Sequence, residues 1–541
     1  MDCSSMKASQ GHSGSGGFHK LYHQTLGDIE SYCLPQFHIL DNNACPGNVM
    51  QKDHLSFQTD SEQFFTLESS PAIVGSAYGS PFSGSVTSSR TLSPQGSQSC
   101  VSDPHQSPEN THGSPLSGSS MVDDGIEWKK RLKGSEASQI VQSRSCLGKS
   151  DTNSEIEWPL MAGMIPCLDL KKVLIACCKA VSEADSNTVA NLMDMLGQMV
   201  SVSGDPIQRL GAYLLEGLRA RLESSGSIIY KALKCEQPTG PELLTYMHFL
   251  YQTCPYWKFA YTSANSIIME VMKDEPAIHI IDFQIAQGSQ WVFLIQALAS
   301  RPCGPPKITI TGVDDSQSVL ARGGGLQIVG RNLQKVANSY GVPFEFRDVG
   351  MHGWEVEPKD LVVPHSEALA VNFPFVLHHM PDESVSTMNH RDRLLRLVRS
   401  LSPRVVTLIE QESNTNTAPF FLRFVETLDF YSAMFESIDA GCLRDDKRRI
   451  SAEQHCVARD IVNIVACEGA ERVERHELLG KWRLRFRMAG FAPCLLGPSV
   501  THAVVDLLKG YHGNYRLEER NGALYLGWLN RALATSSAWK A

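Results

Sequence analysis

The sequence of 541 residues lacks the long apolar segments and the cysteine patterns of several large protein classes. Nowhere do 18 apolar residues follow one another, whereas a membrane-spanning helix needs about 20. The first residues contain no apolar core of a secretory signal. The 15 cysteines are odd in number and never spaced as Cys-x-x-Cys, which argues against a disulfide framework and a zinc ribbon. We therefore expect a soluble, intracellular protein with reduced thiols and no membrane contact.

Positive charge is also scarce. The formal net charge is −9, with 49 basic and 58 acidic residues, and neither residues 1–155 (10 basic, 16 acidic) nor the remainder (39 basic, 42 acidic) is basic overall. DNA contact would therefore need a local patch of basic side chains. The candidates are Arg322 in "ARGGG", Arg391, Arg393, Arg396 and Arg399 at helical spacing, and the loop residues Lys447, Arg448 and Arg449. The alternatives are a flexible connection around Arg322 and a solvated, mixed-charge helix face for the arginine series.

Residues 1–155 have no sustained hydrophobic periodicity, and residues 61–120 contain 18 serines. Such a composition buries too little apolar surface to offset the ordering entropy, which costs about 1–2 kcal/mol per residue. We predict that this region is disordered. Its Ser-Pro pairs are candidate phosphorylation sites and its "WKKRLKG" cluster (128–134) is a candidate nuclear signal, although both patterns also arise by chance. The serines of those pairs are Ser70, Ser80, Ser93, Ser107 and Ser114.

From residue 160 onward the pattern becomes helical and then alternates between strands and helices. About 120 residues with leucine-rich helical stripes come first, and they predict an N-terminal helical cap with a face that could take a partner. Alternating strands and helices then predict a doubly wound parallel sheet covered on both faces. Asn521-Gly522 predicts a late antiparallel hairpin. The predicted strands are 277–282, 307–315, 343–349, 367–375 and 404–412. This order resembles the Rossmann-type α/β fold of S-adenosylmethionine methyltransferases.

The turn after the first strand tests whether this fold binds a cofactor. Written against Asp-x-Gly-x-Gly-x-Gly, Asp282 and Gly288 match, while Gln284 and Ala286 replace the first two glycines. A side chain at such a position costs about 1 kcal/mol or more and occupies the space that the cofactor needs. The sequence therefore predicts a blocked cofactor seat, although a methyltransferase or other small-molecule-binding domain stays the alternative, with Asp314 as its candidate ribose ligand.

No catalytic, cofactor-binding or metal-binding residue is assigned. His378 and His379 are adjacent, so we expect that they cannot both face one metal ion and that they serve in the core or as caps. The acidic residues at the strand ends are expected mostly to cap helices.

Several blocks, all in order over residues 160–541, resemble the plant GRAS family. "IHIIDF" (278–283) resembles its VHIID motif and is flanked by two leucine-rich regions; the PFYRE-type and SAW regions follow. The residues that match these motifs are His279, Ile280, Ile281, Asp282, Pro403, Phe430, Tyr431, Arg475, Glu477, Trp482, Gly490, Trp528 and Trp539. The corresponding regions are 168–230 (first leucine-rich region), 277–291 (VHIID-type), 318–345 (second leucine-rich region), 367–470 (PFYRE-type) and 471–541 (SAW).

"FQIAQGSQW", "ARGGGL" and "VLHHMPDESVS" further resemble the phytochrome-signalling branch of this family. The resemblance implies a transcription regulator of plant light signalling, located in the nucleus and also in the cytoplasm, without enzymatic activity or cofactor. It implies homo- or hetero-dimerisation with GRAS proteins and binding to other transcription factors through the leucine-rich helices. It also implies DNA contact that is either direct or made through those partners. It also implies that His279 and Asp282 hold the strand to the following helix.

Overall fold

The computed structural model describes residues 169–231, 240–315 and 325–541. The N-terminal region predicted to be disordered, with its Ser-Pro pairs and basic cluster, lies outside these residues, and so does Arg322. Among the helices that are described, none is long and apolar enough to cross a membrane.

Helices come first along the described chain, as the leucine-rich stripes predict. They are α6 (Leu170–Ser182), α7 (Ser186–Met199), α8 (Pro206–Glu223), α9 (Gly226–Lys231) and α10 (Gly240–Thr253). Asp169, Asp185 and Asp205 each accept a hydrogen bond from a backbone N–H of the helix that follows. Asp205 also forms a capping box with Gln208, which explains why α8 begins there. The leucine stripes are core: Leu174 and Leu214 are fully buried.

A sheet forms the centre of the fold. Its strands are β1 (Ala277–Asp282), β2 (Lys307–Val313), β3 (Phe344–Val349), β4 (Ala368–Pro374), β5 (Val405–Gln411), β6 (Ala492–Cys494), β7 (Tyr515–Arg520), β8 (Ala523–Trp528) and β9 (Arg531–Lys540). The order is β3-β2-β1-β4-β5-β9-β8-β7, with β6 beside β9. The first five are mutually parallel, and their near-continuous apolar runs reflect burial on both faces.

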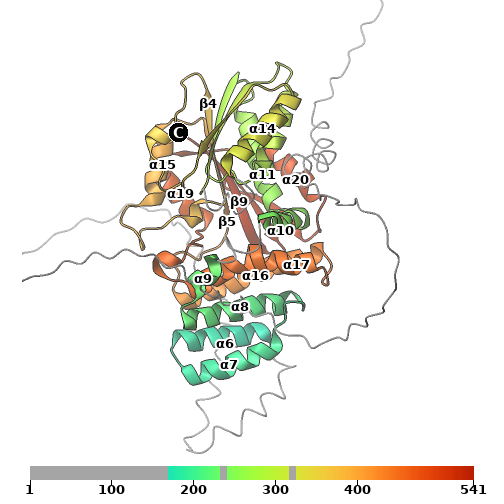
Figure 1. Ribbon diagram of the computed structural model, residues 1–541, viewed down its shortest axis with the longest axis vertical. Coiled ribbons are helices and arrows are strands. Elements are labelled where there is room, and N and C mark those ends of the chain that lie inside the picture. Colours follow the sequence, from blue (N-terminus) through green and yellow to red (C-terminus); the bar gives the residue numbers. More distant parts are fainter. Residues whose placement is uncertain (1–168, 232–239, 316–324) are drawn as a thin grey trace, which may run out of the picture. The chain divides into compact units, whose positions relative to one another are not determined.

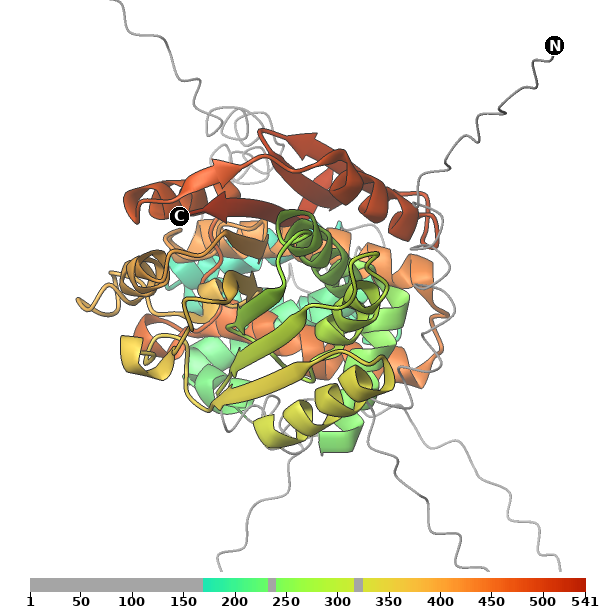
Figure 2. The ribbon, with the colours of Figure 1, turned by 90° about the horizontal axis from the view of Figure 1, so that it is seen from above.

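Helices cover both faces of the sheet (Figures 1 and 2). The later helices are α11 (Tyr256–Val271), α12 (Ser289–Ala299), α14 (Leu326–Ser339), α15 (His390–Ser400), α16 (Phe420–Gly441), α17 (Lys447–Ala452), α18 (Arg459–Ala466), α19 (Leu479–Met488) and α20 (Pro498–Leu508). One core contains residues of α11, α12, α14 and α20, and a second contains residues of α15 and α19. In Figure 1, α6, α7 and α8 are stacked beyond α16, which itself contacts β8 and β9.

The predicted α/β fold with its helical cap is confirmed, and one strand was missed. Asn521 and Gly522 form the expected turn between β7 and β8. The strand β9, which the sequence did not predict, pairs with β5 on one side and β8 on the other. Its polar residues Thr535, Ser536 and Ser537 are buried because the strand is central, and this polarity hides it from a search for apolar runs.

Candidate functional site

The side chain of Asp282 links the end of β1 to α12. Its Oδ2 accepts a hydrogen bond of 2.7 Å from the indole N–H of Trp291, and its Oδ1 accepts one of 3.1 Å from the backbone N–H of Gln284. Burial raises the pKa of Asp282 to about 7 even though these donors favour the carboxylate. Three residues earlier in the same strand, His279 pairs with Thr311 at 2.8 Å and with Glu367 at 3.1 Å. Both side chains are therefore fully engaged within the protein.

The turn after β1 fills the position where a dinucleotide or S-adenosylmethionine would approach. Ala286 adopts φ 47°, and its backbone N–H donates to Asp314 Oδ2 at 3.1 Å. The carboxylate that could hold a ribose is thus bonded to the turn itself. Gly288 has φ 76°, and a Cβ there would lie 2.9 Å from Val329 Cγ1. Of the three glycines in the Asp-x-Gly-x-Gly-x-Gly pattern this turn has only Gly288, and helix α14 packs closely against it.

A cavity of about 130 Å³ lies at the carboxyl ends of β1, β4 and β5. Gln284, Phe375 and Gln411 line it from the strand ends, while Trp257 and Tyr431 line it from α11 and α16. In open α/β sheets this edge, at the point where the strand order reverses, is where ligands bind. Pockets for drug-sized ligands are about 300–1,000 Å³, and this cavity is smaller.

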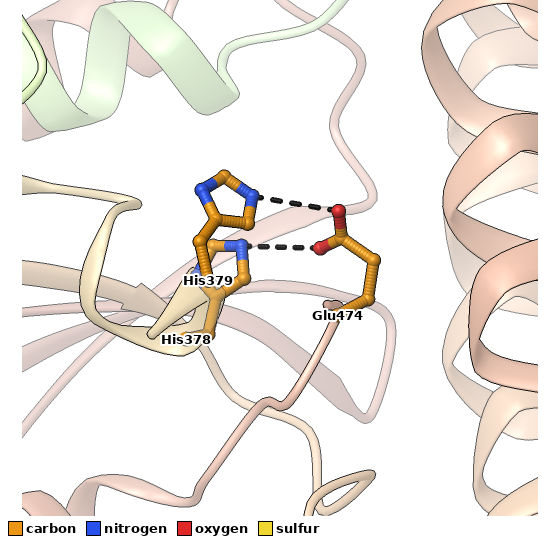
Figure 3. Close-up of side chains that lie close together, drawn as sticks. All are labelled: His378, His379 and Glu474. Carbon is orange, nitrogen blue, oxygen red and sulfur yellow. Dashed lines mark ion pairs between the residues drawn. The ribbon is translucent and has the colours of Figure 1, made fainter. Parts of the chain in front are cut away.

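His378 and His379 line the cavity, and together with Glu474 they form a cluster in which His379 is only half-buried (Figure 3). Glu474 Oε2 lies 3.3 Å from Nε2 of His378, and its Oε1 lies 3.4 Å from Nε2 of His379. His378 Nδ1 lies 2.6 Å from Glu410. Tyr230 donates a further hydrogen bond of 2.8 Å to Glu474. The expectation that the two histidines cannot face one point is wrong, because the short helical turn at 377–379 directs both Nε2 atoms toward one carboxylate.

The electrostatics of the cluster favour a charged His378. Burial opposes the charge on His378, but Glu410 and Glu474 outweigh it and raise the pKa of His378 to about 10. Burial and the nearby charge of His378 hold the pKa of His476 well below its ordinary value. The atoms of His378, His379 and Glu474 lie within 4.8 Å of one another, a spacing that suits a metal ion. The ion pairs with Glu410 and Glu474 already account for this geometry, so the arrangement does not by itself call for a metal.

The candidate DNA-contacting residues are dispersed, and some are inaccessible. Arg391 is 1% exposed and pairs with Glu477 at 3.0 Å, and Arg449 is fully buried and pairs with Glu453 at 2.6 Å. The prediction that these two could contact DNA is wrong, because buried carboxylates bind both guanidinium groups. For Arg391 the prediction assumed that charge at helical spacing faces solvent. For Arg449 it assumed a loop, which is wrong, because Lys447, Arg448 and Arg449 form the first turn of α17.

The remaining basic candidates are only partly available. Arg393 donates to the backbone carbonyls of Trp354 and Val356, and Arg399 donates to Gly490. Arg396, Lys447 and Arg448 are exposed. They lie on α15 and α17, which Figure 1 shows well apart. The exposed candidates therefore do not form one patch.

The family-motif residues lie in the interior, except Gly490, which is exposed. Arg475 pairs with Asp382 at 3.3 Å, and Glu477 receives Arg485 at 2.8 Å. Burial opposes the charge of Glu477, but Arg485 and Arg391 lower its pKa to about 2. Ile280, Ile281, Phe430, Tyr431, Trp482, Trp528 and Trp539 are each at most 3% exposed, Pro403 is buried before β5, and Gly490 follows α19. The buried side chains among them therefore contribute to packing and to internal ion pairs.

Sequence reasoning missed a buried ion cluster that joins the cap to the later helices. Arg209 of α8 pairs with Glu453 at 3.1 Å and with Asp439 of α16 at 2.8 Å. Arg449 shares Glu453. The four-residue spacing of Arg449 and Glu453 was a weak signal, but nothing in the sequence indicated Arg209 as a partner.

Comparison with known proteins agrees with this architecture. The model of the GRAS domain family matches residues 170–540. This chain belongs to the GRAS domain family. Scarecrow-like protein 13 of Arabidopsis thaliana is 56% identical over 544 residues, which cover 99% of each chain. Scarecrow-like transcription factor PAT1 of the same plant is 59% identical over 432 residues, covering 78% of this chain and 88% of that one.

Among solved structures, the crystal structure of SCL7 in Oryza sativa superposes with a TM-score of 0.61 at 33% identity. The match covers 69% of this chain and all of that one. The family inferred from the motifs is confirmed. In this GRAS chain, the VHIID-type segment comprises strand β1, the turn after it and the first residues of α12.

Proposed function

We propose that this protein is a transcription regulator in plant light (phytochrome) signalling that acts in the nucleus, and also in the cytoplasm, through protein partners. The observation that carries the proposal is the 56% identity with Scarecrow-like protein 13 over 99% of both chains. The relative PAT1 is named a transcription factor. The stretches that resemble the phytochrome-signalling branch support the more specific assignment to light signalling.

The geometry of the sheet edge supports a role without catalysis. Asp314, the candidate ribose ligand, is bonded to the turn, and Gln284 stands where the first glycine of a cofactor loop would be. A calorimetric titration with S-adenosylmethionine tests this. We expect no binding tighter than about 100 μM, which corresponds to about −5.5 kcal/mol. Tighter binding would revive the methyltransferase alternative.

Homo- or hetero-dimerisation with GRAS proteins and binding to other transcription factors are proposed to use the exposed parts of the leucine-rich helices. Much of each stripe is core, but Leu222 of α8 is 54% exposed. The separation of the exposed basic residues favours DNA contact through such partners over direct contact.

The regulatory function is tested by tethering the full chain to a reporter promoter in plant cells through a foreign DNA-binding domain. We expect reporter output to change relative to the foreign domain alone, and an unchanged output would contradict the proposal. Selection of random duplex DNA by the untethered chain at two salt concentrations then distinguishes direct DNA binding from DNA binding through partners. Enrichment of one motif that survives higher salt indicates direct reading, because non-specific phosphate contacts weaken steeply with salt.

A further inference from the structure

The two nitrogens of the His378 imidazole make contacts of different kinds. Nδ1 forms a short hydrogen bond of 2.6 Å with Glu410, whereas Nε2 lies 3.3 Å from Oε2 of Glu474. A hydrogen bond between a charged imidazole and a carboxylate is about 2.7–2.9 Å long. The contact between His378 and Glu474 is therefore longer than the charges of the two groups would favour.

Two buried polar atoms at this contact have no hydrogen-bond partner among the described residues. They are Oε2 of Glu474 and Nε2 of His476, which lie 3.8 Å apart. Both residues are 1% exposed, and about nine in ten or more of the buried polar groups in proteins are hydrogen-bonded. The ion pairs around Glu474 therefore leave one of its oxygens open to a further interaction.

The spacing of the two histidines and the glutamate matches that of metal ligands. Nε2 of His379 lies 3.4 Å from Oε1 of Glu474, close to the 3.3 Å between His378 and Oε2. In a tetrahedral zinc site with bonds of about 2.0–2.1 Å, neighbouring ligand atoms are about 3.3–3.4 Å apart. Figure 3 shows both imidazoles on the same side of the carboxylate. One donor atom from each of the three residues lies within 4.8 Å of the other two.

Neighbouring groups occupy the other donor atoms of His378 and Glu474. Glu410 takes Nδ1 of His378 and also accepts a hydrogen bond of 2.8 Å from the backbone N–H of Leu377, so both ends of this contact are fixed. Tyr230 donates to Oε1 of Glu474 at 2.8 Å and leaves Oε2. Metal-binding histidines almost always donate their second ring N–H to a carboxylate, a carbonyl or water. His378 already has this outer partner in Glu410.

The charges of the cluster also favour a cation. Glu410 and Glu474 are both buried and both pair with His378, so two carboxylates share one charged imidazole. A buried charge is costly unless an opposite charge balances it. The second positive charge comes either from a proton on His379 or from a divalent ion in place of the Nε2 proton of His378. The side chain of His379 is 25% exposed and lines the cavity, which gives an ion access to the cluster.

We propose that His378, His379 and Glu474 bind one divalent transition-metal ion, and that zinc suits their donor atoms best. Two imidazoles and one carboxylate are an established zinc donor set, in which water takes the fourth position. The ion replaces an imidazole proton between the three side chains, so it needs none of the cavity volume. It joins the helical turn after β4 to the segment before α19. This site goes beyond the proposed regulatory function and does not depend on it.

Zinc binding to the full chain tests the proposal, with equilibrium dialysis against buffered free zinc and measurement of the bound metal. The chain has 18 histidines and 15 cysteines, so the test is a comparison between variants. We expect His379→Ala to bind one zinc ion fewer per chain than the native protein. His502→Ala is the matched control, because His502 is exposed on α20, and it should keep the native count. Equal zinc content in the native protein and His379→Ala overturns the proposal, and so does an equal loss in His502→Ala.

The choice of ion and a second ligand are tested in the same assay. An excess of Mg²⁺ of about 100-fold should not displace this zinc ion, because Mg²⁺ prefers oxygen ligands. Displacement contradicts a site with two imidazole ligands. Glu474→Gln keeps a carbonyl for the hydroxyl of Tyr230 but removes the charge, and it should weaken zinc binding at least about tenfold. This variant replaces His379→Ala if that protein does not fold, and native zinc affinity in it also contradicts the proposal.

Discussion

Arg209 and Glu453 are both fully buried, and their side chains lie 3.1 Å apart although 244 residues separate them in the sequence. Arg209 belongs to α8, within the leading helices, and Glu453 follows α17. The leading helices are therefore held to the rest of the protein by a desolvated ion pair as well as by apolar packing. A partner that binds these helices contacts an integral part of the fold.

Glu453→Gln should destabilise the protein by about 3–5 kcal/mol, because it leaves two buried guanidinium groups short of a counter-charge. Urea unfolding of the full chain measures this. Glu183→Gln is the control, since its pair with Lys179 spans 3.9 Å between exposed side chains, and we expect a change within about 0.5 kcal/mol. Similar losses in both variants would show that burial of the pair is unimportant.

Arg391 and Arg396 lie on the same helix but should differ sharply in their response to substitution. Arg391→Gln should cost about 3–5 kcal/mol, because it takes one buried guanidinium from Glu477 and leaves the Met380 carbonyl without that donor. Arg396→Gln should change stability by at most about 0.5 kcal/mol, so of the two variants it is the one that can report on DNA binding. Thermal unfolding of both variants measures the difference. A stable Arg391→Gln protein would show that Arg485, which also pairs with Glu477, is enough to balance this carboxylate.

Gly288 is constrained by both conformation and space, whereas Gly341 is constrained by conformation alone. Both have positive φ, but a Cβ on Gly341 meets no atom within 4 Å. We expect Gly341→Ala to cost about 1 kcal/mol and Gly288→Ala to cost clearly more, because its Cβ would crowd Val329 and Leu333. Urea midpoints of the two variants give the comparison. Equal costs would mean that α14 shifts to make room.

Glu412 should make stability fall as the pH rises. Burial raises its pKa from 4.5 to about 7. Its contribution is therefore fully present below about 4.5 and is lost as the pH rises through about 7. Glu412→Gln cannot lose a proton and keeps a carbonyl for the backbone N–H of Leu479. Relative to the native protein, this variant should become more stable between about pH 5 and about pH 8, as measured by urea unfolding.

Glu383→Gln is a control for which we expect the opposite pH dependence of stability. Arg485 holds the pKa of Glu383 below its ordinary value of 4.5, so the contribution of Glu383 is present above about 4.5 and is lost as the pH falls. The deficit of this variant should shrink on acidification. If the free energy of unfolding of Glu412→Gln differed from that of the native protein by the same amount at every pH, the stated role of Glu412 would be ruled out.

The elements that the sequence predicted are those whose pattern is local. Buried parallel strands appear as apolar runs, and amphipathic helices appear as stripes, so both follow from neighbouring residues. The predictions that failed concern residues whose environment is set by parts of the chain that are distant in sequence. Arg391 and Arg449 look solvent-exposed in sequence, and only the fold supplies their carboxylates. The cavity likewise combines Gln284, Gln411 and Tyr431, which no sequence spacing relates. The strand β9 was missed because pairing on two sides, not apolar side chains, places it in the sheet.

The position of β9 has a consequence for synthesis of the chain on the ribosome. It is the last strand along the described residues, yet it lies between β5 and β8. While the ribosome is still translating the preceding segment, the edge of β5 has no neighbour, and an unpaired strand edge is a template for aggregation. Until this strand has emerged from the exit tunnel, the open edge of β5 in the nascent protein can pair with other chains.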